Sequence, residues 1–278
     1  MKKAFPAVLC MCAAFRLSAL GGMEEAPVYP VPDGMELVWS DEFGTDGAPD
    51  PARWDYSLGG NGWGNGELQN YTDSRDNSWI KDGRLFIAAR KNDGKWTSAR
   101  LKTQFLGDWK YGYFEIRAKL PAGRGTWPAI WMMPMLDTYG GWPRSGEIDI
   151  MEHVGFDENV IHHSLHSRDL NHRNGNQITA SVRIDRAVNA FHTYALEWDP
   201  QFIRWLVDGR ETFRAENPGT GNGAWPFNIP FYLILNVAIG GEWGGQQGID
   251  SGLKRAVMEV DYVRVYQRPE TAENTAGE

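Results

Sequence analysis

The sequence predicts an all-β fold, a two-sheet antiparallel β-sandwich of jelly-roll type, and three observations support that prediction. Residues 113–120, YFEIRAKL, alternate apolar and polar side chains with the period of two of a half-buried strand. Residues 231–239, FYLILNVAI, are continuously apolar, as expected of a central strand covered on both faces. Capped helical patterns longer than about three turns are absent, whereas Gly, Pro, Asp and Asn repeatedly end short apolar runs.

Strand-like segments follow one another at short spacing along the chain. In order they are 84–91 (RLFIAARK), 113–120, 194–199 (YALEWD), 202–209 (FIRWLVDG), 231–239 and 260–267 (VDYVRVYQ). The segments on either side of Asp199-Pro200 predict a β-hairpin. Many short strands joined by long glycine-rich loops predict two packed sheets in a single domain.

The N-terminal 22 residues have the features of a secretory signal peptide. Two lysines precede an apolar run over residues 4–15, and small residues follow it. Leu9 and Met11 are bulky where a lipoprotein site before Cys10 or Cys12 needs small residues, so we do not expect a lipid anchor. We therefore expect a secreted protein with a signal peptide (1–22), a short leader (23–30), one large domain (31–268) and a polar tail (269–278). We also expect a monomer.

Charge and cysteine content narrow the possible partners. Both cysteines lie in the predicted signal peptide, so the mature chain has neither a disulfide nor a thiolate metal site. Without the signal peptide, 25 basic residues face 36 acidic ones, a net charge of −11. Such a surface repels phosphate backbones and anionic lipids, which argues against nucleic acid and membranes and favours a neutral partner. Beyond the signal peptide, apolar runs long enough to span a membrane are absent.

Tryptophan is unusually abundant in the loops of this chain. The 13 tryptophans include several beside Gly or Pro, in NGWGNGE, GTWPAIW, GGWPRSG, GAWPF and GGEWGG. Some of these rings fill irregular loop cores. Large flat rings in such loops also suit a cleft that stacks on sugar rings, and we expect at least four of the five loops to line one.

An acidic triplet stands in the otherwise apolar stretch RSGEIDIMEHVG. Glu147 and Asp149 share one face of a strand, but strict alternation would turn Glu152 into the hydrophobic interior. A buried, unpaired carboxylate is costly. One extra residue at Ile150-Met151, a β-bulge, returns Glu152 to the face of the other acids, and bulges are frequent beside active sites.

The bulge brings the two glutamates to a catalytic spacing. Four strand steps separate their Cα atoms by roughly 13 Å, and side chains leaning inward bring the carboxyls to roughly 5–6 Å, as in retaining glycosidases. One carboxylate then acts as nucleophile and the other as general acid. Crowding of like charges raises at least one pKa, and Asp149 can share a proton with a neighbour.

Three other interpretations of these residues compete with catalysis. A carboxylate row can bind Ca²⁺, although calcium sites usually take oxygens from a loop. The triplet can also be a solvated edge. Zinc is the third, because all six histidines lie between residues 153 and 192, but an HExxH motif is absent. His162 and His166 would lie about 13 Å apart on one strand face, so we expect His166 to point into the cleft as a hydrogen-bond donor.

The acidic stretch resembles the signature of glycoside hydrolase family 16, in its laminarinase-type form with the extra bulge residue. Other segments resemble the same family in the same order: LVWSDEF, GGNGWGNGELQNYT, SARLKT, YGYFEIRAKLPAGRGTWPAIWMMP, GAWPFNIPFYLILNVAIGGEW and VDYVRVYQ. The resemblance covers about residues 36 to 267. One departure is Asn228, since the family often has Asp after GAWPF.

The resemblance implies a jelly roll with a long substrate cleft on its concave face. It gives Glu147 the role of nucleophile, Glu152 that of acid/base, Asp149 that of helper, and places His166 near the acid/base. The sugar-binding residues it implies are Asn65, Arg100, Trp127, Trp131, Trp142 and Trp225. It also implies a possible structural Ca²⁺ at Glu42, the Gly83 carbonyl and Asp261, and no cofactor for catalysis.

The predicted function is that of a secreted, retaining endo-β-glucanase. Its substrates would be neutral polysaccharides with internal β-1,3 linkages, as in laminarin, or mixed β-1,3/1,4 linkages, as in lichenan and cereal β-glucan. The alternatives are a non-catalytic β-glucan-binding lectin on the same fold, and a hydrolase of another neutral or algal galactan such as agarose. A lectin would be expected to lack one or both glutamates, and both are present.

Overall fold

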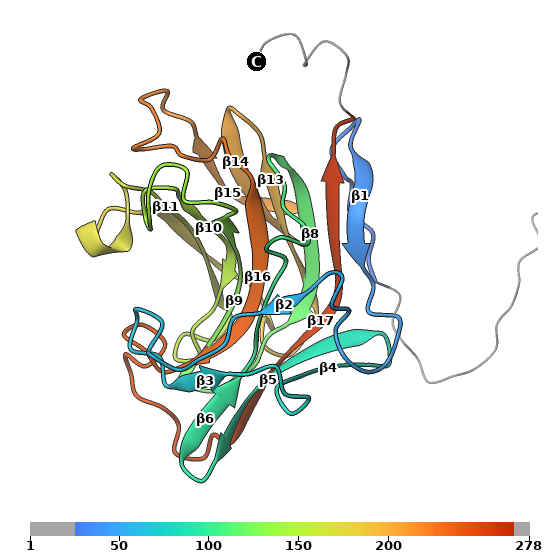
Figure 1. Ribbon diagram of the computed structural model, residues 1–278, viewed down its shortest axis with the longest axis vertical. Coiled ribbons are helices and arrows are strands. Elements are labelled where there is room, and N and C mark those ends of the chain that lie inside the picture. The colour runs from blue at the N-terminus through green and yellow to red at the C-terminus, as the bar shows by residue number, and fades with distance from the viewer. Residues whose placement is uncertain (1–25, 270–278) are drawn as a thin grey trace, which may run out of the picture.

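The computed structural model describes residues 26–269, so the predicted signal peptide and nearly all of the polar tail lie outside the described residues. Figure 1 shows two curved sheets packed against each other. The predicted all-β sandwich is confirmed. Within the described residues the helical content is one short 3-10 turn, η1 (His172–Asn174). None of the helical structure there is long and apolar enough to cross a membrane.

One sheet has seven strands and carries the cleft, so we call it the cleft sheet. Its order is β12 (Ile178–Arg183), β11 (Val160–His166), β10 (Glu147–Glu152), β9 (Thr126–Pro134), β16 (Phe231–Ile239), β7 (Arg100–Lys102) and β2 (Asp55–Tyr56). All neighbours in this sheet are antiparallel. The continuously apolar segment 231–239 is the central strand β16, and all of its residues are buried.

The second sheet has ten strands and forms the back of the molecule, so we call it the outer sheet. Its order is β15 (Arg210–Glu216), β14 (Phe202–Val207), β13 (His192–Trp198), β8 (Gly112–Lys119), β17 (Arg255–Gln267), β5 (Arg84–Asn92), β6 (Lys95–Ser98) and β3 (Gln69–Tyr71); β1 (Glu36–Asp41) also pairs with β17, and β4 (Ser78–Lys81) with β5. Strands β13 and β14 form the hairpin predicted around Asp199-Pro200. One pair departs from the antiparallel prediction, because β3 runs parallel to β6.

The core lies between the two sheets and is rich in aromatic side chains. Trp198 of the outer sheet meets Phe231 of the cleft sheet edge-on at 5.4 Å, and Trp205 of the outer sheet meets His163 of the cleft sheet at 5.9 Å. Both tryptophans and Phe231 are fully buried. The polar face of β8 is also buried, with Arg117 paired to Asp261. Two packed sheets therefore give the cleft a rigid base.

Candidate active site

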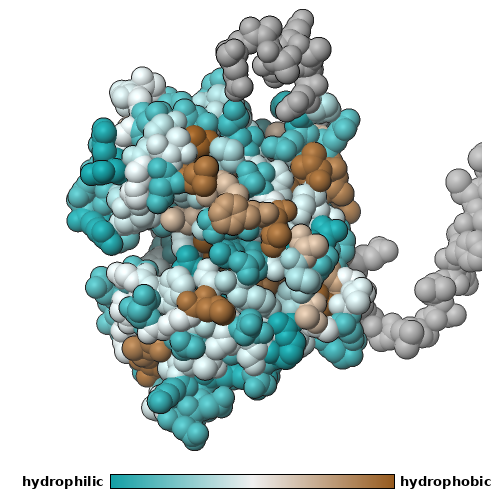
Figure 2. Space-filling model, in the orientation of Figure 1, coloured by the Kyte–Doolittle hydropathy of each residue, from teal (hydrophilic) through white to brown (hydrophobic). Residues whose placement is uncertain are grey.

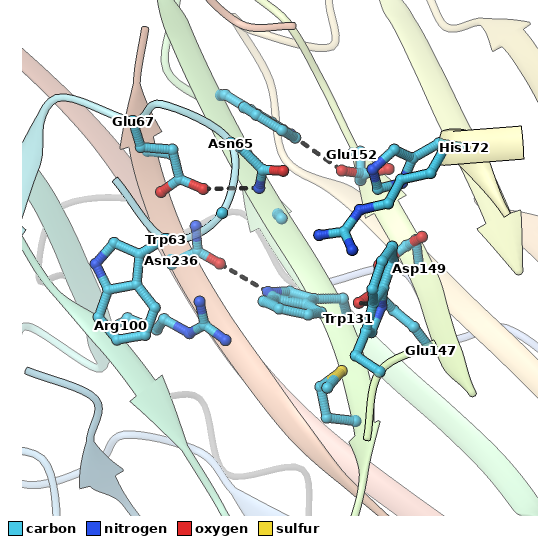
Figure 3. Close-up of a pocket in the computed structure, with 17 residues that line it drawn as sticks. Trp63, Asn65, Glu67, Arg100, Trp131, Glu147, Asp149, Glu152, His172 and Asn236 are labelled. Carbon is cyan, nitrogen blue, oxygen red and sulfur yellow. Dashed lines mark hydrogen bonds between the residues drawn. The ribbon is translucent and has the colours of Figure 1, made fainter. Parts of the chain in front are cut away.

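Two hollows meet on the open face of the cleft sheet, and the acidic strand lies at their junction. They measure about 300 and 480 Å³ and share Asn65, Trp127, Glu147, Glu152 and His172. Figure 2 shows the molecule notched at the edge where the sheets of Figure 1 curve inward, and Figure 3 shows the side chains that line the first hollow. A polymer can therefore extend from the acids in two directions.

The bulge predicted in β10 is present. Asp149 pairs with Trp131 of β9 and Met151 with the next residue, Ile130, so one residue of β10 is extra. Against β11, the three steps from Asp149 to Glu152 face only two, from Ser164 to His162. Ile148, Ile150 and Met151 are all fully buried in the core. The extra residue thus leaves all three acids on the cleft face.

A glycine sets where the acidic strand begins. Gly146 precedes Glu147 and has φ +93°, a conformation that favours glycine. A Cβ there would lie 3.0 Å from the rings of Phe227 and Phe231. The chain therefore passes close over these rings before β10 starts, which fixes the position of Glu147.

Each glutamate of the pair accepts a hydrogen bond from an indole. Trp142 Nε1 donates to Glu147 Oε2 at 2.9 Å, and Trp127 Nε1 donates to Glu152 Oε1 at 3.0 Å. Trp127 lies on β9, whereas Trp142 lies in the loop between β9 and β10. The two carboxyls are thus held in place by tryptophans that also line the cleft.

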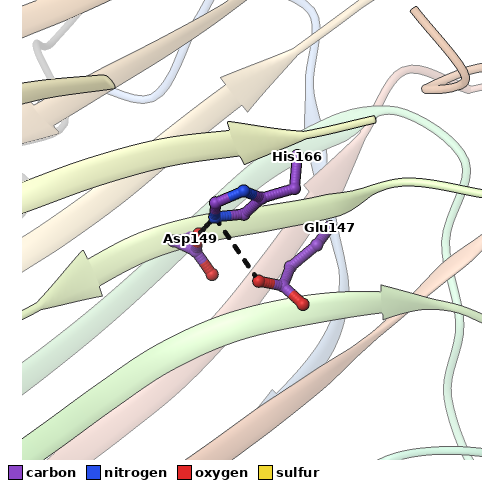
Figure 4. Close-up of side chains that lie close together, drawn as sticks. All are labelled: Glu147, Asp149 and His166. Carbon is purple, nitrogen blue, oxygen red and sulfur yellow. Dashed lines mark ion pairs between the residues drawn. The ribbon is translucent and has the colours of Figure 1, made fainter. Parts of the chain in front are cut away.

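His166 lies over the first two acids, as Figure 4 shows. Its Nε2 is 3.2 Å from Asp149 Oδ2 and 3.6 Å from Glu147 Oε1. Its Nδ1 accepts a hydrogen bond from the backbone N–H of His172 at 3.4 Å. This contact leaves the neutral ring with its proton on Nε2, directed at the two carboxylates.

Burial raises the pKa of all three acids. It is the largest cause for Glu147, whose pKa rises to about 8, and Asp149 adds to it while His166 and the Trp142 hydrogen bond oppose it. The pKa of Glu152 also rises to about 8, from burial first and then from the charges of Asp149 and Glu67. Burial alone raises the pKa of Asp149. Each glutamate thus has acidic neighbours that disfavour its charge, and each has an indole and His166 that support it.

Beyond the acids, polar and aromatic side chains form one wall of the first hollow. The Arg100 guanidinium lies 4.6 Å from the ring centres of both Trp63 and Trp131. Trp131 Nε1 donates to Asn236 Oδ1 at 2.7 Å, and Asn65 Nδ2 donates to Glu67 Oε1 at 3.1 Å. Asn65, Arg100, Trp127, Trp131 and Trp142 therefore lie together in the cleft, as the sequence predicted.

The structure adds residues that sequence reasoning did not select. They are Trp63, Glu67, Asn236 and Arg173 in the first hollow, His162 and Trp243 in the second, and His172 in both. Trp63 and Trp243 belong to Trp-containing loops that the sequence did single out, and Glu67 stands two residues after Asn65. Asn236 lies inside an apolar strand, and the one feature of the sequence that could have pointed to it is that it is polar.

Trp225 is a correction to the predicted sugar-binding set. Its side chain is only 3% exposed and belongs to the core, where it meets the Phe227 ring edge-on at 5.0 Å. It borders a separate hollow with Tyr111 and Asn228, and the three acids are not among the residues that line that hollow. Packing against Phe227 removes the apolar ring from water, which stabilises Trp225 in the core. The Gly and Pro residues beside it made its loop resemble the cleft loops in sequence, but they do not determine where the ring packs. The other four Trp loops do line the cleft.

The predicted calcium residues do not fit a calcium site in this arrangement. Glu42 receives two hydrogen bonds of 2.8 Å from Arg264, and Asp261 pairs with Arg117 at 2.5 Å. Calcium needs six to eight oxygens, and these carboxylates already face cations. Gly83 lies in the turn between β4 and β5. Within residues 26–269, the group of side chains spaced for a metal is Glu147, Asp149 and His166.

Comparisons with known proteins agree on one family. The family model described as Glycosyl hydrolases family 16 matches residues 65–264. A beta-glucanase of Rhodothermus marinus is 53% identical over 243 residues, covering 84% of this chain and 85% of that protein. A glucan endo-1,3-beta-glucosidase A1 of Niallia circulans is 37% identical over 87% of this chain and 39% of its own length. The X-ray structure of the laminarinase from Rhodothermus marinus superposes with a TM-score of 0.82 at 52% identity, covering 85% of this chain and 98% of that one.

Proposed function

The chain belongs to glycosyl hydrolases family 16, and we propose that it is a retaining endo-β-glucanase of β-1,3 or mixed β-1,3/1,4 glucans. The observation that carries this proposal is the bulged strand β10, which places Glu147, Asp149 and Glu152 on the floor of a tryptophan-lined cleft. Relatives named as a beta-glucanase, a glucan endo-1,3-beta-glucosidase and a laminarinase support the substrate class.

The surroundings of each carboxyl suggest its role. Glu147 accepts from Trp142 and lies near the Nε2–H of His166; these two donors stabilise its carboxylate against the burial that raises its pKa, and we assign it the role of nucleophile. Burial and the acidic neighbours Asp149 and Glu67 favour a proton on Glu152, which donates it to the leaving glycosidic oxygen. Glu152 then takes a proton from the water that hydrolyses the glycosyl-enzyme bond.

Cleavage inside the polymer follows from the position of the acids. Both glutamates border both hollows, so sugar residues can occupy the cleft on either side of the cut. Trp63, Arg100 and Trp131 lie on one side, and His162 and Trp243 on the other. Flat rings at both ends provide stacking surfaces for successive sugars.

The test is product analysis on laminarin, lichenan and agarose, with the anomeric configuration of the first products followed by NMR. We expect β-configured oligosaccharides from the two glucans and no release from agarose. Glu147→Gln and Glu152→Gln should each lower kcat on laminarin by about three orders of magnitude while the protein stays folded. Products of α configuration would contradict the retaining mechanism, and full activity in either variant would contradict the assignment.

The same assay separates hydrolysis from mere binding. A glucan-binding lectin would retain laminarin on an affinity gel and release no reducing ends. Release from agarose alone would instead favour the galactan alternative. The first result would overturn the proposed hydrolysis, and the second would overturn the proposed substrate class.

Secretion and the monomeric state also remain proposals. The pattern of residues 1–22 supports a cleaved signal peptide. N-terminal sequencing of the protein exported from its host cell would test cleavage near residues 19–21, and light scattering would test the monomer.

A further inference from the structure

Two backbone carbonyls at the bulge of β10 find partners outside the ladder of the sheet. An extra residue in one strand locally disrupts the ladder and leaves backbone groups without strand partners. Here the Asp149 carbonyl accepts a hydrogen bond from Trp205 Nε1 at 2.9 Å. The Ile150 carbonyl lies 2.8 Å from His163 Nδ1. Trp205 belongs to β14 of the outer sheet, so this bond crosses the sandwich.

These contacts lie where water cannot replace them. Trp205 is fully buried and His163 is 1% exposed. Their rings lie nearly parallel, with centres 5.9 Å apart. A buried carbonyl left without a hydrogen-bond donor destabilises the folded protein, because water cannot reach it. Each of the two donors therefore favours the backbone conformation that the bulge has here.

Thr212 of β15 completes the group by fixing the tautomer of His163. A carbonyl can only accept, so Nδ1 must carry the ring proton. Nε2 is then an acceptor, and the Thr212 hydroxyl lies 3.0 Å from it and 3.2 Å from the Trp205 carbonyl, so its one proton is shared between these two acceptors. Burial lowers the pKa of His163 to about 4, which keeps the ring neutral near neutral pH. One N–H therefore remains aimed at the Ile150 carbonyl.

We propose that His163, Trp205 and Thr212 act as positioning residues that hold the bulge of β10 and thereby keep Glu152 in register with Glu147. Without the two donors, β10 can relax toward regular alternation, which turns Glu152 away from the cleft. This inference rests on the proposed function, because it explains how the acid/base is placed. The three side chains lie on the core side of the sheet and do not border either hollow.

The test compares a substrate that needs an acid with one that does not. Laminarin has a sugar leaving group that must be protonated, whereas dinitrophenyl β-laminaribioside has a leaving group that departs unaided. His163→Leu and Trp205→Phe each remove one donor. We expect each to lower kcat/KM on laminarin by about 100-fold, as a misplaced general acid would, and on the aryl glycoside by less than about 5-fold.

Three further variants complete the design. His163→Asn keeps an N–H for the Ile150 carbonyl and should stay within about 10-fold of wild type on laminarin. Thr212→Val removes the tautomer-fixing hydroxyl and should give an intermediate loss on laminarin only. Ile161→Val shortens another buried side chain of β11 and should lower the unfolding temperature while both substrates are cleaved as by wild type.

Two outcomes would overturn the proposal. One is an equal proportional loss on both substrates in His163→Leu and Trp205→Phe, which would show a general structural role. The other is a His163→Asn variant as impaired on laminarin as His163→Leu. Failure of the proposed function is distinguishable, because wild-type protein would then release nothing from either substrate.

Discussion

At the scale of single residues, the protonation of Glu147 and Glu152 couples activity to stability. Burial raises both pKa values above those of exposed glutamates, so the folded protein binds these protons more tightly than the unfolded chain. The resulting stabilisation is complete below about pH 4 and is lost as the pH rises through the folded pKa, near 8. Around and above that pH, Glu147 and Glu152 are ionised in the folded protein, and their burial makes these charges destabilising.

Glu147→Gln should therefore be more stable than the wild type at high pH and about equal to it in acid. Glutamine stays neutral, so the variant avoids a cost that we place on the order of 2 kcal/mol at about pH 9. Thermal unfolding of both proteins between about pH 4 and pH 9 measures this difference. A difference in unfolding temperature that grows as the pH falls would contradict the raised pKa of Glu147.

Residue-level prediction from sequence gave the correct position of the acids in the cleft and missed Asn236. The acids can be recognised from local sequence, because three carboxylates in an apolar run are unusual. Asn236 serves the cleft through partners far away in the chain, Trp131 at 2.7 Å and Tyr71 at 3.0 Å. A single sequence cannot reveal such pairs because it carries no record of which strands are neighbours.

At the scale of elements, the bulge in β10 contains one residue more than the neighbouring strands, so one residue can be deleted while the three acids stay on the same face. Deleting Met151 leaves GEIDIE, in which regular alternation already puts all three acids on the cleft face. We expect this variant to fold with about 3 kcal/mol less stability, because a fully buried side chain is lost, and to keep measurable activity on laminarin. Deleting Ile148 should abolish activity, because it turns Glu147 away from Asp149. Equal inactivity of two folded deletion variants would refute this.

The loop carrying Trp225 gives a second element-scale prediction. Its tryptophan packs in the core against Phe227, whereas Trp131 lines the cleft. Trp225→Ala should cost about 3 kcal/mol of stability and leave KM for laminarin unchanged at a temperature where the protein is folded. Trp131→Ala should do the reverse, raising KM with a smaller change in unfolding temperature. A raised KM in Trp225→Ala would return that residue to the sugar-binding set.

At the scale of the whole molecule, the sequence predicted the class of fold but not the order of its strands. The apolar run of β16 correctly predicts a strand covered on both faces, which is local information. The alternation in residues 113–120 predicts a half-buried strand, which is wrong for β8, because contacts with the rest of the chain bury its polar face as well. The order β9-β16-β7 and the parallel pairing of β3 with β6 depend on contacts between strands far apart in the chain. Those contacts also decide which loops meet over the cleft, and so why Trp225 was misplaced.

Two ion pairs on the outer sheet also predict how the protein responds to metal removal. Arg264 and Arg117 already neutralise Glu42 and Asp261, and the mechanism moves protons only between carboxyls, water and sugar oxygens. EDTA should therefore leave both the unfolding temperature and kcat on laminarin unchanged, and added Ca²⁺ should have no effect after EDTA is removed. A fall in unfolding temperature that Ca²⁺ reverses, and that Asp261→Asn abolishes, would instead show that the ion displaces the arginines. A loss of kcat alone would point to an ion bound by Glu147, Asp149 and His166, the group spaced for one.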